Sequence, residues 1–163
     1  MKEQRDVLAG AIAGLAGGLV ASFVMNEFQA AVSAFQTKKG SSGSGDLPAT
    51  EKAAIGISEG VFNHEMTATG RKEAGEAMHY AIGGVSGMIY GVASEVAPST
   101  TAGGGLPFGA AVWLVADDVA VPALGLSKPA TEFPLSTHAY ALGSHLVYGL
   151  TTDLVRRSVR QIL

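Results

Sequence analysis

The chain has 163 residues, enough for one domain, and contains no cysteine. Only 15% of its residues are charged, against about 25% in a typical soluble domain, and 47% are hydrophobic. This composition argues against an ordinary soluble enzyme and against a disordered chain, and the lack of cysteine excludes disulfides, thiolate metal sites and cysteine nucleophiles. The net charge of −3, with no long basic run, argues against nucleic-acid binding.

Four hydrophobic segments organise the chain, at about residues 7–35, 78–97, 106–126 and 136–155. Each has about 20 residues or more, the length that a helix needs to cross a bilayer core of about 30 Å, and none contains Lys or Arg. We therefore predict an all-α, polytopic membrane protein, a four-helix transmembrane bundle in a single membrane domain over residues 1–163. The alternative is a soluble, alanine-rich helical bundle, which would need a solvated face on every helix.

A polar loop, residues 36–77, separates the first two segments. Its glycine- and serine-rich part, residues 37–46, is typical of a flexible linker. Residues 50–66 space their apolar side chains three or four apart, which predicts a short amphipathic helix on the membrane surface or over the bundle, with Thr50 as its cap. The polar stretch GRKEAGEA is expected to form a turn before the second segment, and Ser136 is the expected cap of the fourth.

The two halves of the chain repeat each other's small and polar residues. The spacing of Gly14, Gly18, Asn26 and Glu27 recurs in Gly105, Gly109, Asp117 and Asp118. The spacing of Ser86, Tyr90, Gly91 and Glu95 recurs in Ser144, Tyr148, Gly149 and Asp153. The bundle is therefore expected to consist of two similar helical hairpins, whose glycine ridges let the helices pack closely. No glycine cluster follows a predicted strand, so a phosphate-binding loop is not expected.

Polar residues inside the hydrophobic segments are the candidate functional residues. A charged carboxylate in hydrocarbon is costly, so it must be protonated, bind a cation, hydrogen-bond to histidine or lie in a water-filled cavity. The order of the segments brings one group together toward the long loop: Asn26, Glu27, His79, Asp117, Asp118, His138 and His145. Toward the opposite end lies a secondary set, Glu95 and Asp153, and Asp153 can pair there with Arg156 or Arg157. Trp113, Tyr80 and Tyr140 are expected to be interface or packing aromatics.

These residues leave three functions open. The preferred one is the handling of protons or cations, in which the carboxylates take up the ion and the histidines relay or co-ligate it. The second is a non-catalytic accessory subunit of a larger membrane complex or a homo-oligomeric scaffold, which uses the glycine ridges to pack on its partners. The polar residues would then form only a structural hydrogen-bond network that orients the helices. The third is a metal-binding membrane enzyme, although no catalytic residue is predicted. A divalent metal could then bind at Asp117, Asp118, His138 and His145, whereas a haem would need His79 with His138 or His145 as axial ligands.

Two stretches carry a family resemblance. Residues 108–157 (FGAAVWLVADDVAVPALGLSKPATEFPLSTHAYALGSHLVYGLTTDLVRR) and 79–95 (HYAIGGVSGMIYGVASE) resemble the YagU-like proteins, small and uncharacterised proteins of the bacterial inner membrane. The resemblance covers about half of the chain. It implies a polytopic protein of the bacterial inner (cytoplasmic) membrane, and it implies no catalytic residue because the family has no established chemistry.

The distribution of basic residues bears on orientation. Both ends of the chain are basic, through Lys2, Arg5, Arg156, Arg157 and Arg160, which predicts cytoplasmic termini. The basic residues of the long loop, Lys38, Lys39, Arg71 and Lys72, argue for the reverse. The expected partners are the lipid bilayer and either further copies of the chain or a larger membrane complex, without nucleic acid.

Overall fold

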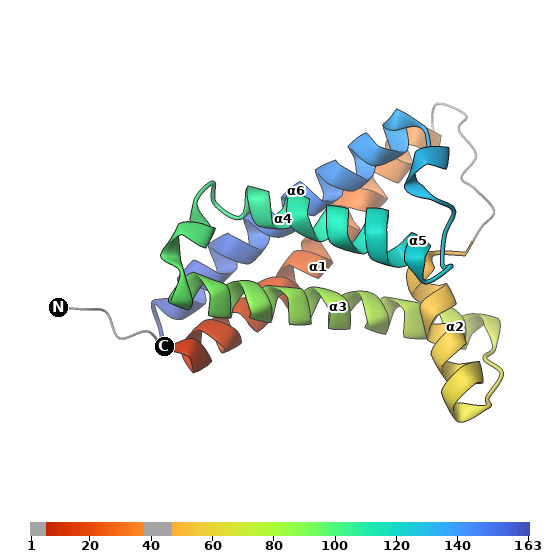
Figure 1. The fold of residues 1–163 in the computed structure, drawn as a ribbon, viewed down its shortest axis with the longest axis horizontal. Helices are drawn as coiled ribbons and strands as arrows, with labels where there is room; N and C mark the ends of the chain where they lie inside the picture. The colour runs from red at the N-terminus through yellow and green to blue at the C-terminus, as the bar shows by residue number, and fades with distance from the viewer. Residues whose placement is uncertain (1–5, 38–46) are drawn as a thin grey trace.

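The computed structural model describes residues 6–37 and 47–163, which form helices without strands. The long helices are α1 (Val7–Thr37), α2 (Ala49–Phe62), α3 (Ala68–Val96), α4 (Leu106–Trp113) and α6 (Leu135–Arg160). Between α4 and α6 lie a π-helical segment η2 (Leu114–Ala120), one turn α5 (Val121–Ala123) and the 3₁₀ turn η3 (Ala130–Glu132); the 3₁₀ turn η1 (Pro98–Thr101) follows α3. In Figure 1, α1, α3, α6 and the stretch from α4 to α5 run between the same two ends of the molecule, and α2 crosses α3 at one end.

Two of the predicted spans are helices long and apolar enough to cross a membrane, Val7–Phe35 and Leu106–Ala123. Within the described residues, α3 and α6 are also long enough but are less apolar and do not meet the same criterion. The core helix of a soluble protein can be equally apolar when it is buried. Only 6% of the residues of Leu106–Ala123 are fully buried, however, so most of this helix is partly or fully exposed.

The second helical segment begins ten residues earlier than predicted. The stretch GRKEAGEA, expected to be a turn, forms the first turns of α3, which begins at Ala68. Its start is stabilised by Thr67, whose side-chain oxygen accepts a hydrogen bond from the Gly70 N–H at 3.1 Å. These turns pack against α2, where a Cβ atom added to Gly75 would lie 3.1 Å from the Cα atom of Glu51.

Two predicted caps are wrong. Thr50 lies inside α2, which begins after Pro48, and Ser136 lies inside α6, which begins after Pro134. In both places the proline leaves the chain extended immediately before the first helical residue. Helix α1 ends at Thr37, the first residue of the predicted linker. The rest of the linker, residues 38–46 with Lys38 and Lys39, lies outside the described residues, as do Lys2 and Arg5.

Helices α1 and α3 touch backbone to backbone at their glycines. A Cβ atom added to Gly14 would collide with the carbonyl oxygen of Gly87 and lie 2.8 Å from the Cα atom of Gly91. A Cβ atom on Gly18 would collide with the carbonyl oxygen of Gly83. The predicted ridge of small residues is therefore the contact surface of the first hairpin.

Helices α4 and α6 repeat this contact at the equivalent positions. A Cβ atom on Gly105 would collide with the carbonyl oxygen of Gly149, and one on Gly109 would collide with that of His145. In the spacing that relates the two halves, Gly14 and Gly91 correspond to Gly105 and Gly149. The two hairpins therefore close through the same pair of positions.

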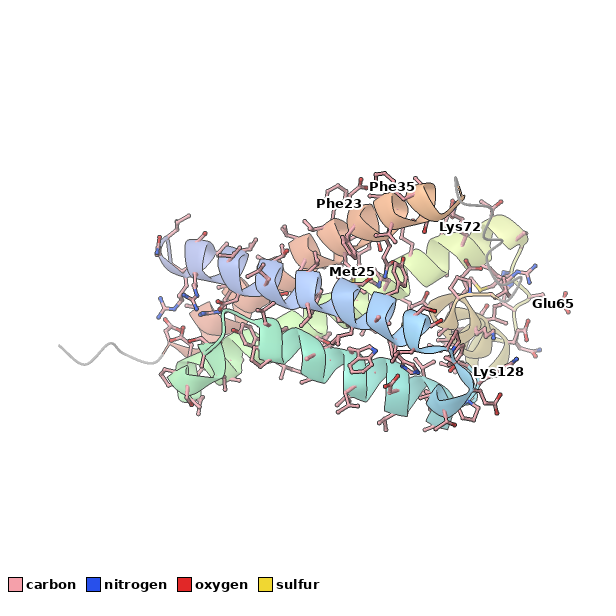
Figure 2. The ribbon with its side chains drawn as sticks, turned by 90° about the horizontal axis from the view of Figure 1, so that it is seen from above. Phe23, Met25, Phe35, Glu65, Lys72 and Lys128 are labelled. Carbon is pink, nitrogen blue, oxygen red and sulfur yellow. The ribbon has the colours of Figure 1, made fainter. Side chains whose placement is uncertain are left out.

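The hairpins join through α1 and α6 around a small core. Met25 packs there with Ala21 and Tyr148, and Phe108 and Val112 of α4 pack against them. The Tyr148 hydroxyl donates a hydrogen bond of 2.6 Å to the carbonyl oxygen of Gly83, which ties α6 to α3. Figure 2 shows Met25 directed toward α6, whereas Phe23 and Phe35 point away from the bundle.

Apolar side chains also cover the outer surface of the α4–η2 stretch. Leu114, Val115 and Val119 are 51%, 62% and 57% exposed. Soluble monomers rarely expose apolar side chains in such continuous runs. This surface is therefore suited to contact with lipid or with a protein partner.

We predict that Gly14→Ala destabilises the fold, because the added methyl group must push two backbones apart. Overpacking of this kind costs about 1–3 kcal/mol. The matched control is Gly143→Ala on α6, where an added Cβ atom meets nothing within 4 Å. Thermal unfolding of the purified protein, followed by circular dichroism, should show a lower midpoint for the first variant only. Equal midpoints would mean that the glycine contact does not stabilise the hairpin.

Candidate functional site

The candidate site is built on the π-helical segment η2, and Pro122 gives the physical reason for that segment. In a regular α-helix the nitrogen of Pro122 would face the carbonyl of Asp118, but proline has no N–H and its ring clashes with that carbonyl. The wider turn removes this clash, and the N–H of Val121 bonds to the carbonyl oxygen of Ala116, five residues back. Asp117 and Asp118 lie within this widened turn.

Each of these two aspartates faces a different histidine of α6. Oδ1 of Asp118 lies 3.5 Å from Nδ1 of His138, and Oδ2 of Asp117 lies 3.7 Å from Nδ1 of His145. The two histidines are seven residues apart and therefore share one face of α6. The predicted convergence of these four residues is thus present as two carboxylate–imidazole pairs between facing helices.

Hydrogen bonds to backbone carbonyls fix how the histidines carry their protons. Nε2 of His138 lies 2.9 Å from the carbonyl oxygen of Ala130, and Nδ1 of His145 lies 2.9 Å from that of Ala141. A carbonyl oxygen can only accept, so each of these nitrogens carries a hydrogen. In the neutral ring the other nitrogen is then free to take up a proton.

His79 of α3 belongs to the same group. Its Nε2 lies 3.4 Å from the carbonyl oxygen of Ser22, so this ring also binds a backbone carbonyl through one nitrogen. His79 interacts electrostatically with His145 and with Asp117. The structure therefore brings together five of the seven predicted residues, from three different helices.

Asn26 and Glu27 are the two that do not join. Within the described residues, neither side chain makes a hydrogen bond or an ion pair, and Glu27 is exposed. Glu27 stands nine residues after Gly18, and at about 100° per residue of an α-helix nine residues end on the opposite side of the helix. Asp118 has the same spacing from Gly109, but the π-helical turn changes its direction and brings it onto α6.

The arrangement of donors does not form a metal site. Within the described residues, no group of three or more His, Asp or Glu side chains is placed to hold a metal ion. Asp117 and Asp118 instead turn toward different histidines. A divalent ion needs several ligands that converge on one point, and these pairs do not supply such a point.

A pocket of about 190 Å³ opens beside the Asp118–His138 pair. It lies between the α4–η2 stretch and α6, and residues of α2 and of the loop before α6 also line it. Its walls include Trp113, whose ring contacts His138 edge-on with 6.2 Å between the ring centroids. The sequence predicts only an interface or packing aromatic at Trp113. Its position one helical turn before Asp117 was the signal that could have placed it in the site.

The secondary residues at the opposite end form ion pairs. Asp153 is 1% exposed and accepts hydrogen bonds of 2.9 Å from the Tyr90 hydroxyl and from Nη2 of Arg156, while Nε of Arg157 lies 2.7 Å from its other oxygen. Glu95 pairs with Arg160 at 2.8 Å. The expected pairing of Asp153 with arginine is confirmed. Because their partners are guanidinium groups and a tyrosine hydroxyl, these two carboxylates form a structural connection between α3 and α6.

Comparison with known proteins shows the family of the chain. Residues 44–154 match the model of a protein family of unknown function, DUF1440, and the chain belongs to that family. The match begins within the long loop and runs through most of α6, and α1 lies outside it. The match confirms that the chain belongs to an uncharacterised family, but it does not confirm the resemblance to the YagU-like proteins by name. No curated protein and no solved structure matches the chain.

We predict that Asp153→Asn strongly destabilises the protein, because two arginines would lose their buried partner. Breaking a buried ion pair from one side costs about 3–5 kcal/mol. Glu95→Gln, which disrupts the more exposed pair at the same end, should cost clearly less. The measurement is the thermal midpoint of each purified variant, and a similar loss in both would contradict the structural role assigned to Asp153.

Proposed function

We propose that this protein is a four-span protein of the bacterial inner membrane that carries protons or cations through Asp117, Asp118 and three histidines. The observation that supports this most directly is the pair of carboxylate–imidazole contacts between η2 and α6. Acids and histidines inside membrane helices are typical of ion pathways and proton relays.

The surroundings of the two pairs support a role in exchange. No Lys or Arg forms an ion pair with Asp117 or Asp118 within the described residues, in contrast to Asp153. A carboxylate held by guanidinium groups keeps its charge permanently balanced. One that faces only imidazole is balanced when the imidazole is protonated, so proton binding and charge balance are linked.

The arrangement of the helices supports four spans. Helices α3 and α6 are less apolar than the other two, but each is in backbone contact with an apolar helix, which covers part of its polar surface. Helix α2 crosses α3 at one end of the bundle (Figure 1), so it would lie along the membrane surface if the long helices cross the membrane. Its exposed Ile57, Val61 and Phe62 suit that position.

The alternative functions predict different observations. An accessory or scaffold subunit would use the exposed surface of the α4–η2 stretch to bind a protein partner, and its polar pairs would only orient helices. A metal-binding enzyme would need further ligands, because the described residues hold no group of three. We prefer the ion pathway because it requires only the histidines and carboxylates that already lie close together in the structure.

A labelling experiment tests the four spans. The chain lacks cysteine, so single cysteines can be placed at Glu65, Ser99, Lys128 and Ile162 and labelled with a membrane-impermeant maleimide in sealed vesicles. Four spans put Glu65 and Lys128 on one side, as Figure 2 shows them at one end of the bundle. Ser99 and Ile162 should then react from the cytoplasmic side. If only the two most apolar helices cross, Glu65 would instead label with Ser99, and Lys128 with Ile162.

A flux experiment tests the pathway. We expect proteoliposomes with the wild-type protein to dissipate an imposed pH or cation gradient, followed by entrapped dyes. Asp118→Asn and His138→Gln should reduce the rate to that of empty liposomes, because each removes one partner of the pair beside the pocket. Glu27→Gln is the matched control and should keep the wild-type rate, since Glu27 lies outside the site. Unchanged flux in both site variants would overturn the proposal, and no flux in the wild type would favour the accessory role.

A further inference from the structure

The ring of His138 faces a different oxygen atom at each of its two nitrogens. Nε2 lies 2.9 Å from the carbonyl oxygen of Ala130 in η3, and Nδ1 lies 3.5 Å from Oδ1 of Asp118 in η2. A carbonyl oxygen and an ionised carboxylate can only accept hydrogen bonds. A neutral imidazole has one N–H and can therefore satisfy only one of these two partners.

The carbonyl of Ala130 determines which nitrogen lacks a hydrogen in the neutral ring. Its contact is the shorter of the two, so Nε2 carries the hydrogen and Nδ1 presents a lone pair to the carboxylate of Asp118. Two acceptor atoms that face each other repel, whereas a proton between them makes the contact attractive. The contact seen in the structure is therefore the one expected of a pair that has bound one proton.

The contact between His145 and Asp117 needs no added proton. Nδ1 of His145 lies 2.9 Å from the carbonyl oxygen of Ala141, so this nitrogen already carries a hydrogen in the neutral ring. The same nitrogen faces Oδ2 of Asp117 at 3.7 Å. A hydrogen therefore lies on the atom that faces the carboxylate in either charge state of the ring, and the two carboxylate–imidazole pairs differ in their dependence on proton binding.

Helices α4 and α6 touch at Gly109, and the pocket lies between η2 and α6 further along. A Cβ atom added to Gly109 would collide with the carbonyl oxygen of His145, so His145 lies at the backbone contact itself. His138 is two turns away on α6 and lines the pocket of about 190 Å³ together with Asp118 of η2. The contact of Asp118 with His138 therefore bridges η2 and α6 at the pocket, away from the glycine contact.

We infer that Asp118 and His138 bind one exchangeable proton between them and that this proton holds η2 against α6. As a step in transport, the inference rests on the proposed function and narrows its ion to the proton. On uptake, a hydrated proton forms an N–H bond at Nδ1 and leaves a neutral water, and the carboxylate balances the imidazolium charge. On release, the two acceptors face each other again, so η2 moves away from α6 and the pocket widens, while the contact at Gly109 stays in place. No electrons are transferred.

Few other charged groups lie around His138. Segment η2 presents Asp117 beside Asp118, and α6 carries His145 two turns away. The charged residues of α1 and of the loop before α6 are exposed: Glu27, Lys128 and Glu132. The remaining residues of the pocket wall, from α2, α4, the loop and α6, carry no charge. Asp118 is therefore the charged group that His138 faces directly.

The pH dependence of one distance tests the inference. The chain has no cysteine, so spin labels can be attached to Leu124→Cys beside α5 and Ser136→Cys on α6, both exposed positions near the pocket. We expect the distance between these labels, measured by electron paramagnetic resonance, to increase when the pH is raised until His138 loses its proton. Labels on Ala102→Cys and Ser158→Cys, exposed positions at the end held by the glycine contact, should keep their distance.

The substitution Asp118→Asn separates the proton from the rest of the contact. An amide N–H can donate to Nδ1 of the neutral ring, so the contact no longer needs a proton and the label distance should not change with pH. Glu27→Gln, which changes an exposed acid outside the site, should keep the wild-type pH response. A wild-type distance that does not change with pH, or an equal response in Asp118→Asn, would overturn the inference.

Nitrogen NMR of the wild type with ¹⁵N-labelled histidine keeps the test decisive if Asp118→Asn does not fold. In the neutral rings, the hydrogen should lie on Nε2 of His138 and on Nδ1 of His145. The reverse placement in either ring would contradict the inference. A pH-dependent distance without proton flux in liposomes would overturn the proposed function and leave the proton-dependent contact standing. Proton flux without a change of distance would overturn this inference alone.

Discussion

Direct contact between helix backbones at glycine positions determines how close the helices of this protein lie. At Gly14 and Gly91, and again at Gly105 and Gly149, no side chain fits between the two helices. Lipid tails are as apolar as leucine, so close backbone packing of this kind is a principal source of helix association in a membrane. It also brings the helices near enough for short polar side chains to meet across them. The contacts of Tyr90 with Asp153, and of the η2 aspartates with α6, depend on this approach.

The two ends of the bundle place the same acidic group in different surroundings. Toward the termini, Asp153 is buried against guanidinium groups that are always charged. Toward the long loop, Asp118 faces an imidazole whose charge depends on its own proton. In the first arrangement the carboxylate is paired with fixed positive charges, whereas in the second its charge is balanced only when the imidazole carries its extra proton. The contrast within one chain separates a structural acid from a functional candidate better than burial alone does.

Much of this organisation could be predicted from the sequence because it follows from spacing. The segment lengths predict the long helices, and the glycine spacing predicts the close contacts of α1 with α3 and of α4 with α6. The seven-residue interval between His138 and His145 predicts that they share one face of α6. Helix starts were less predictable, because Pro48 and Pro134 precede the helices where Thr50 and Ser136 were expected to cap them. The repeat predicts that Glu27 and Asp118 point in equivalent directions. This prediction is wrong because Glu27 lies in a regular α-helix, whereas Asp118 lies in the wider π-helical turn.

Some contacts between the described residues could not be predicted from the sequence. The pocket wall joins residues from α2, from η2 and from the loop before α6, which no periodicity relates. Trp113 was singled out only as an aromatic at an interface, and its unsatisfied N–H depends on where surrounding chains pass. Predictions of this kind require the positions of elements that are distant in sequence.

The widened turn before Pro122 has a consequence for how the two halves of the chain could diverge. A π-helical turn is equivalent to one extra residue wound into an α-helix. If the halves descend from one ancestral hairpin, a change of winding redirected an acidic pair that both copies carry at the same distance from their glycines. In the second copy the acidic pair then faces the histidines of α6, whereas Glu27 of the first copy stays exposed. A proline and a local change of pitch are therefore enough to give two similar hairpins different polar contacts.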